Sequence, residues 1–99
     1  MGKFGEIIRT RREEKGMLLR QLAALIDMDT AILSKVERGE RRAKREQVEI
    51  IAKVLNINKN SLIVEYLSEN IAYEIHDEDL AIEALKVAEE KVKYLKENK

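Results

Sequence analysis

The sequence has no cysteine, no proline and no tryptophan, and its 99 residues include a single histidine, His76. Without cysteine the chain can form neither a disulfide nor a thiolate metal site, one histidine cannot build a histidine metal cluster, and we find no Ser/His/Asp constellation around His76. A glycine-rich phosphate loop is also missing. We therefore expect no enzyme activity, no metal, no cofactor and no small-molecule ligand.

Long apolar runs are missing as well. The first residues, MGKFGEIIRTRR, contain none, so we expect neither a signal peptide nor a membrane span, and we expect a cytoplasmic protein. Only four glycines, three tyrosines and one phenylalanine accompany many Leu, Ile, Ala, Glu and Lys residues. At this length, the composition predicts one all-α domain with a single modest core.

The net charge is zero, but the two halves of the chain differ in sign. Residues 1–54 contain thirteen Lys and Arg against nine Asp and Glu, a balance of +4, whereas residues 55–99 contain six against ten, a balance of −4. A basic front half suits a polyanionic partner, and an acidic back half would keep the rest of the molecule away from it. Solvated helix faces explain the same pattern about equally well.

Residues 17–39, MLLRQLAALIDMDTAILSKVERG, have the pattern of two short helices joined by a sharp turn. Asp27 tolerates the positive φ that such a turn needs, Asp29 can cap the second helix, and Gly39 can end it. Small Ala23 suits the point where the helices cross. Apolar residues recur at helical spacing on both sides of Asp27: Leu22, Ala23, Leu25 and Ile26 before it, and Ile32, Leu33 and Val36 after it.

A helical wheel of residues 30–38 separates this apolar arc from an outer arc of small and cationic side chains. The outer arc consists of Thr30, Ala31, Ser34, Lys35 and Arg38. The first four are our candidate base readers in a DNA major groove, since the methyls of Thr30 and Ala31 suit thymine and Lys35 suits guanine acceptors. Because strong hydrogen-bonding groups are few, we expect DNA shape to supply much of the specificity.

The densest cationic run follows directly behind this helix. When the helix lies in the groove, a phosphate strand would pass over the run, and phosphate contacts fix register without reading sequence. The alternative is a solvated loop. The candidate phosphate-binding residues are Arg38, Arg41, Arg42, Lys44 and Arg45.

Further helices are predicted over residues 3–15, 18–26 and 45–55, and a fifth begins after a capping Asn58. Their inward residues are predicted to be Phe4, Ile7, Ile8, Val48, Ile51, Ala52, Leu55, Leu62, Ile63, Tyr66 and Leu67. Residues 71–75 fit a short extended segment or a continued helix. The triplet Asp77-Glu78-Asp79 lacks the spacing of a calcium loop, so we interpret it as the acidic start of a long helix that ends near Glu97.

The chain resembles the XRE (Cro/C1-type) helix-turn-helix family of phage and bacterial regulators over roughly residues 4–67. The resemblance rests on Arg12, Gly16, Leu22-Ala23, Leu33, Val36, Glu37-Arg38-Gly39, Ala52 and Leu55. Length and architecture also resemble the controller proteins of restriction-modification operons, with antitoxins and phage repressors as other subgroups.

This resemblance implies a five-helix domain over residues 1–68 with a helical extension over residues 69–99. It implies a sequence-specific transcriptional regulator that binds double-stranded DNA as a homodimer on an inverted repeat. It also implies an ion pair between Arg12 and Glu37, for which two independent surface charges are the alternative. Where relatives have a capping Ser and a phosphate-binding Gln, this chain has Leu18 and Leu19, which could pack against the C-terminal part or a partner.

The last predicted helix has two apolar stripes. One consists of Ala81, Leu85, Ala88, Val92 and Leu95, and it could pack on the domain. The other repeats at seven-residue spacing and makes Leu80, Val87 and Tyr94 candidates for dimerisation. A protein-interaction module, such as an antitoxin or adaptor that binds through the second and last helices, is the alternative function.

Overall fold

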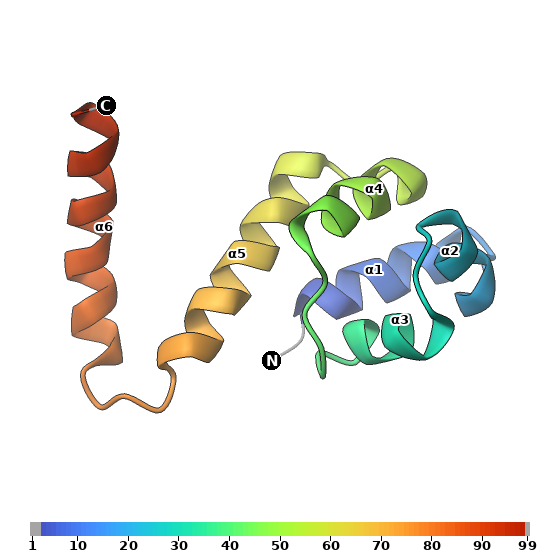
Figure 1. Cartoon of the computed structure of the whole chain (residues 1–99), viewed down its shortest axis with the longest axis horizontal. Helices are drawn as coiled ribbons and strands as arrows, with labels where there is room; N and C mark the ends of the chain where they lie inside the picture. Colours follow the sequence, from blue (N-terminus) through green and yellow to red (C-terminus); the bar gives the residue numbers. More distant parts are fainter. Residues whose placement is uncertain (1–2, 99) are drawn as a thin grey trace.

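The computed structural model describes residues 3–98, and within them it contains six α-helices and no strand (Figure 1). The predicted all-α class is confirmed. The helices are α1 (Lys3–Glu14), α2 (Leu19–Leu25), α3 (Thr30–Glu37), α4 (Arg45–Leu55), α5 (Lys59–Ile75) and α6 (Ala81–Glu97). Among the described residues, no helix has both the length and the apolar character needed to cross a bilayer.

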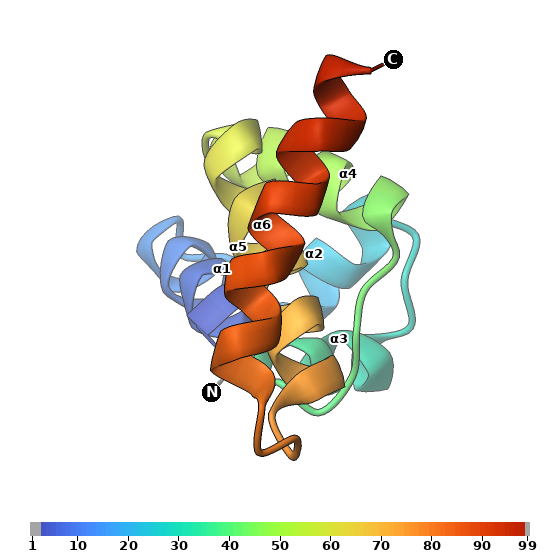
Figure 2. The same ribbon diagram turned by 90° about the vertical axis from the view of Figure 1, so that its left-hand side faces the viewer.

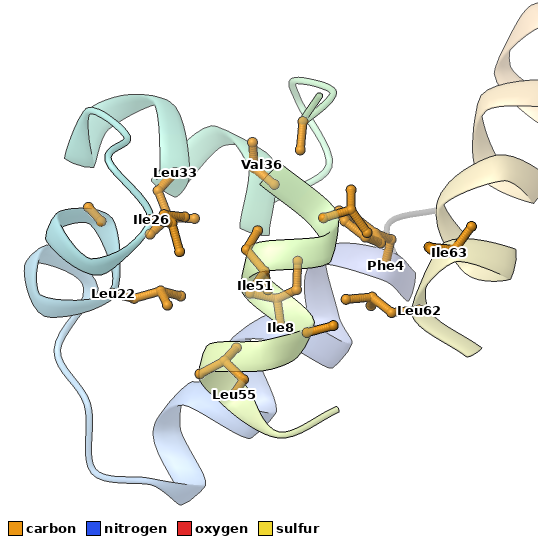
Figure 3. Close-up of a cluster of buried hydrophobic side chains, with 14 residues drawn as sticks. Phe4, Ile8, Leu22, Ile26, Leu33, Val36, Ile51, Leu55, Leu62 and Ile63 are labelled. Atoms are coloured by element: carbon orange, nitrogen blue, oxygen red, sulfur yellow. The ribbon is translucent and has the colours of Figure 1, made fainter. Parts of the chain in front are cut away.

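The first five helices surround one apolar core, to which each contributes a stripe (Figure 3). The largest fully buried side chains are Ile8, Leu22, Leu33, Val36, Val48, Ile51, Leu55 and Leu62. Full burial of one such side chain contributes about 1.5–3 kcal/mol, so this cluster is the main source of the domain's stability. The prediction that Leu67 points inward is wrong, because this part of α5 extends past the core and Leu67 is exposed. Leu25 is also exposed.

Local turn chemistry ends four of the helices. Gly16, Asp27, Gly39 and Asn56 all have φ between 53° and 76°, the left-handed region that Gly, Asn and Asp tolerate best. The caps predicted at the starts of α3 and α5 are formed. The Asp29 carboxylate accepts from the amides of Ala31 and Ile32, and the Asn58 side chain accepts from the amide of Ser61.

The chain beyond the domain differs from the prediction in where its last helix starts. α5 continues as a helix to Ile75, so it runs past position 68, and the second alternative for residues 71–75 is the one observed. The acidic triplet at 77–79 does not start α6. It lies in the turn between α5 and α6, where the Glu78 amide donates to the Ile75 carbonyl and the Ala81 amide to the Glu78 carbonyl. No side chain caps α6 at Leu80.

α6 stands away from the five-helix domain (Figure 1). In the view turned by 90°, it crosses in front of α5, but the first view shows that the two helices diverge from their shared turn (Figure 2). α6 contains no buried residue. The predicted packing of its Leu85 stripe on the domain of the same chain is therefore not formed, and both of its apolar stripes face solvent.

Candidate nucleic-acid interface

The turn between α2 and α3 sets the direction of α3. Asp27 has φ 53°, and the Met28 amide donates to the Ala23 carbonyl at 2.9 Å. Ala23 is buried at the crossing, where a longer side chain would separate the helices. Asp29 then places a carboxylate at the positive end of the α3 dipole, so α3 starts abruptly at Thr30.

α3 buries one side and presents the other. Leu33 and Val36 are buried and Ile32 packs against the core. The four candidate base readers share the opposite side, with Thr30, Ala31 and Lys35 exposed and Ser34 half-buried. α3 lies along one edge of the domain, and among the described helices neither α5 nor α6 covers that edge (Figures 1 and 2). A face of small and cationic side chains is thus available to a groove.

The end of α3 is held to α1 by a buried ion pair. Arg12 Nε donates to Glu37 Oε2 at 2.8 Å and Arg12 Nη2 to Oε1 at 2.9 Å, while Nη1 reaches the Met17 carbonyl at 2.8 Å. The side chains are 12% and 6% exposed. The hydrogen bonds to Glu37 outweigh desolvation and raise the pKa of Arg12 above its ordinary value. This is the pair that the family resemblance implies.

Gly5 allows α1 and α3 to approach closely beside this ion pair. A Cβ built on Gly5 would lie 2.6 Å from the Val36 carbonyl oxygen, and it would overlap the Glu37 carbonyl as well. Any side chain here would push the two backbones apart. Gly5 could not be identified from the sequence, because a glycine inside a helix does not indicate which other helix packs against it.

Arg38 is held in place by neighbouring side chains. Its Nε and Nη2 donate to the carboxylate oxygens of Glu40 at 2.9 and 3.3 Å, and Nη1 donates to Ser34 Oγ at 2.9 Å. The hydrogen bonds from Arg38 lower the pKa of Glu40. A phosphate would have to compete with this carboxylate for Arg38, a restraint that the sequence analysis did not include.

The other candidate phosphate-binding residues lie on or beside the loop between α3 and α4, and all of them are exposed. Arg42 Nη2 donates to the Asn70 carbonyl at 3.5 Å, and Arg45 lies 3.6 Å from Glu49. Within residues 3–98, Arg41 and Lys44 have no side-chain ion pair. The loop therefore places two unpaired cations, Arg41 and Lys44, beside α3.

α5 anchors this loop through two tyrosines. Tyr66 Oη donates to the Ala43 carbonyl at 2.7 Å, and Tyr73 Oη lies 3.4 Å from the Gly39 carbonyl. The sequence pattern predicts Tyr66 only as a core residue and predicts no role for Tyr73. The one available signal was the polar end of each ring, which seeks a hydrogen-bond partner when the rest of the ring is covered.

The start of α2 departs from the family pattern, because Leu18 at the N-cap position provides no side-chain cap. The side-chain oxygen of Gln21 accepts from the Leu18 amide at 2.8 Å, which is the half of a capping box that reaches back to the N-cap residue. Leu19 packs against the core, whereas Leu18 is exposed. Neither leucine packs on the C-terminal helix, which stands elsewhere (Figure 1).

Two helices joined by a sharp turn, with the second exposed along an edge, define a helix-turn-helix protein. The helix-turn-helix family model matches residues 8–62, more than half of the chain. The chain belongs to this family, in its XRE (Cro/C1) form, whose fold is a DNA-binding and non-enzymatic one. Comparison with curated proteins and with solved structures gave no match.

Proposed function

We propose that this protein is a sequence-specific transcriptional regulator that binds an inverted repeat as a homodimer, with α3 in the major groove. The observation that supports this most is the uncovered outer face of α3, which is small and cationic and is followed by a cationic loop. Major-groove recognition needs a face that is free of bulky apolar groups and carries hydrogen-bond donors at its centre.

Contacts to DNA would divide into two kinds. Thr30, Ala31, Ser34 and Lys35 would read base edges, with the two methyls against thymine and the ammonium against guanine O6 or N7. The loop cations would bind phosphates without regard to sequence. The cations in this second group are Arg38, Arg41, Arg42, Lys44 and Arg45, of which Arg38 would first exchange Glu40 for a phosphate.

Selection of bound duplexes from a random pool tests the proposal directly. We expect an enriched motif with two-fold symmetry, whose half-sites are spaced by about 10 base pairs or a multiple of that. Lys53→Ala is a matched control for charge, because Lys53 is exposed and lies in the last turn of α4, outside both α3 and the loop between α3 and α4. The control should select the same motif as the natural chain. Absence of enrichment at low salt would contradict the proposal.

The homodimer would bring two domains, each spanning residues 1–68, onto the two half-sites, and residues 69–99 would join them. Leu80, Val87 and Tyr94 are the candidates for this role because all three are exposed. The DNA upstream of the protein's own gene is the first place to look for the repeat.

An interaction module that binds a partner protein is the second candidate function. Exposed Leu18 and Leu25, at the two ends of α2, together with the solvent-facing α6, favour it. The same selection separates the two candidates: an enriched symmetric motif supports the regulator, and failure to bind any duplex at low salt supports the module.

A further inference from the structure

Exposed apolar side chains are concentrated in the second half of the molecule. Among residues 3–98, eleven of the fourteen exposed large hydrophobic side chains occur from Val64 onward. Monomeric proteins rarely leave contiguous apolar surface of this extent in water. These eleven are Val64, Leu67, Ile71, Tyr73, Leu80, Ile82, Leu85, Val87, Val92, Tyr94 and Leu95.

α5 contributes one stripe to this surface. Val64, Leu67 and Ile71 are spaced by three and four residues, so they lie on one face of the helix. Val64 is 62% exposed and Ile71 is 50% exposed. The core-facing side of α5 is a different one, since Leu62 and Ile63 are buried in the domain. The stripe therefore lacks a partner in the single chain.

α6 has an apolar face that is interrupted only by Lys91 and covers about half of its circumference, wider than one neighbouring helix can bury. Its Leu85 and Val92 lie near one edge of this face, and its Val87 and Tyr94 lie near the other. Two neighbouring helices, one on each edge, would bury it. The apolar residues of α6 on this face are Ala81, Ala84, Leu85, Val87, Ala88, Val92, Tyr94 and Leu95.

The α5 stripe and the Leu85 edge of α6 have matching registers. Counted outward from the centre of the turn at 76–80, Ile71 is as far along α5 as Leu85 is along α6, and Val64 is as far as Val92. These pairs are those of two antiparallel helices, yet α6 of the same chain diverges from α5 and buries nothing (Figures 1 and 2).

The Val87 edge repeats at a spacing of seven residues. Leu80 and Tyr94 lie seven residues to either side of Val87. When two such helices meet in parallel about a two-fold axis that runs along the pair, each of these three residues meets its own copy in the other chain. A self-complementary patch of this kind is what a two-fold interface between identical chains requires.

We propose that two copies of this chain exchange their C-terminal helices, so that α6 of each copy covers Val64 and Ile71 on α5 of the other and pairs with the other α6 around Val87. α5 and α6 of both copies then form a four-helix bundle. Exchange of one identical element is a low-cost route to a dimer, because each contact between α5 and α6 repeats one that the chain could make with itself. This inference rests on the homodimer part of the proposed function and is independent of DNA binding.

The dimensions of α6 are adequate for such an interface. A helix of 17 residues is about 26 Å long and about 10 Å wide, so an apolar half of its surface offers on the order of 400 Å². Together with the two α5 stripes, two copies reach the range of about 1,200 Å² of total buried surface at which stable interfaces begin.

Because the natural chain has no cysteine, introduced cysteines can test the exchange. The full chain carrying Ile71→Cys and Leu85→Cys is oxidised at low concentration and separated by non-reducing denaturing electrophoresis. We expect a covalent dimer from the double variant, and monomers from each single variant. A bridge within one chain, no bridge at all, or a covalent dimer from Leu85→Cys alone would each overturn the exchange. Both residues lie outside the core, so circular dichroism should show an unchanged fold.

Sedimentation measures the strength of the interface with a matched pair of variants. Leu85→Gln removes an apolar contact from the proposed bundle, whereas Lys86→Gln introduces the same side chain at the centre of the polar face of α6. We expect the dimer dissociation constant to rise by about tenfold or more for the first and to stay unchanged for the second. Equal effects, or a natural chain that is monomeric throughout, would refute the inference. Selection of a symmetric DNA motif by the natural chain is a separate result and tests the regulator alone.

Discussion

Replacing Glu37 with alanine should destabilise the domain severely. The change leaves the Arg12 guanidinium, which is 12% exposed, without the carboxylate that accepts two of its hydrogen bonds. Breaking a buried ion pair from one side costs about 3–5 kcal/mol, out of the about 5–15 kcal/mol by which a domain of this kind is stable. For a domain of this size, each 1 kcal/mol lowers Tm by about 4–8 °C, so we expect Tm to fall by about 12 °C or more.

Urea denaturation followed by circular dichroism gives the loss in free energy, and an exposed ion pair on the same helix provides the control. Arg9 and Glu13 are 3.6 Å apart and more than half exposed, so Glu13→Ala should cost less than about 1 kcal/mol. If Glu37→Ala cost no more than this control, the claim that the pair clamps α1 to α3 would be refuted.

A double variant separates the contribution of the two charges to stability from the contribution of side-chain packing at the same site. Arg12→Met combined with Glu37→Leu replaces both charges with apolar groups, and such replacements are often neutral or stabilising where the single changes are not. We expect the double variant to be more stable than Glu37→Ala. Recovery should be incomplete, since Arg12 Nη1 also donates to the Met17 carbonyl and methionine cannot replace that bond.

Three further predictions concern the contact between α1 and α3 and the DNA-facing surface. Gly5→Ala should lower the free energy of unfolding by about 1–3 kcal/mol in urea titrations, because its Cβ would overlap backbone of α3; an unchanged midpoint would contradict the close crossing. In binding assays against base-substituted duplexes, Lys35→Ala should relax preference at one base pair by about 1–3 kcal/mol, whereas Arg41→Ala should weaken all sequences alike and reduce the salt slope by about 1. Equal patterns for these two variants would refute the division into base and phosphate contacts. Glu40→Gln should release Arg38 and strengthen binding to all duplexes at low salt; weaker binding would show that Glu40 holds Arg38 in a productive position.

The sequence allowed the ends of the helices to be predicted because local chemistry determines them. Asp27, Gly39 and Asn56 adopt the left-handed region that few other residue types tolerate, and Asp29 and Asn58 accept hydrogen bonds from amides within three residues of themselves. Neither effect depends on the rest of the fold. For the same reason, the exposed face of α3 followed from the wheel once Leu33 and Val36 were assigned to the core.

Features that depend on distant segments could not be predicted in this way. Gly5 matters because the end of α3, about thirty residues later in the chain, crosses it. Tyr66 and Tyr73 matter because α5 passes behind the loop that follows α3. The start of α6 was placed too early because an acidic triplet favours a helix N-terminus only where a helix begins, and here α5 continues to Ile75 and leaves the triplet in a turn.

α5 connects the loop between α3 and α4 to the surface on which we propose that the second copy packs. Tyr66 and Tyr73 fix the loop carbonyls from one side of the helix, while Val64 and Ile71 face solvent on another. If α6 of a second copy covers Val64 and Ile71, α5 sets the spacing between the two α3 helices. The same helix also positions the loop between α3 and α4. A change in the α5 stripe that weakens the dimer should then reduce affinity for the complete inverted repeat while leaving affinity for a single half-site unchanged, since each domain keeps its own loop and recognition helix.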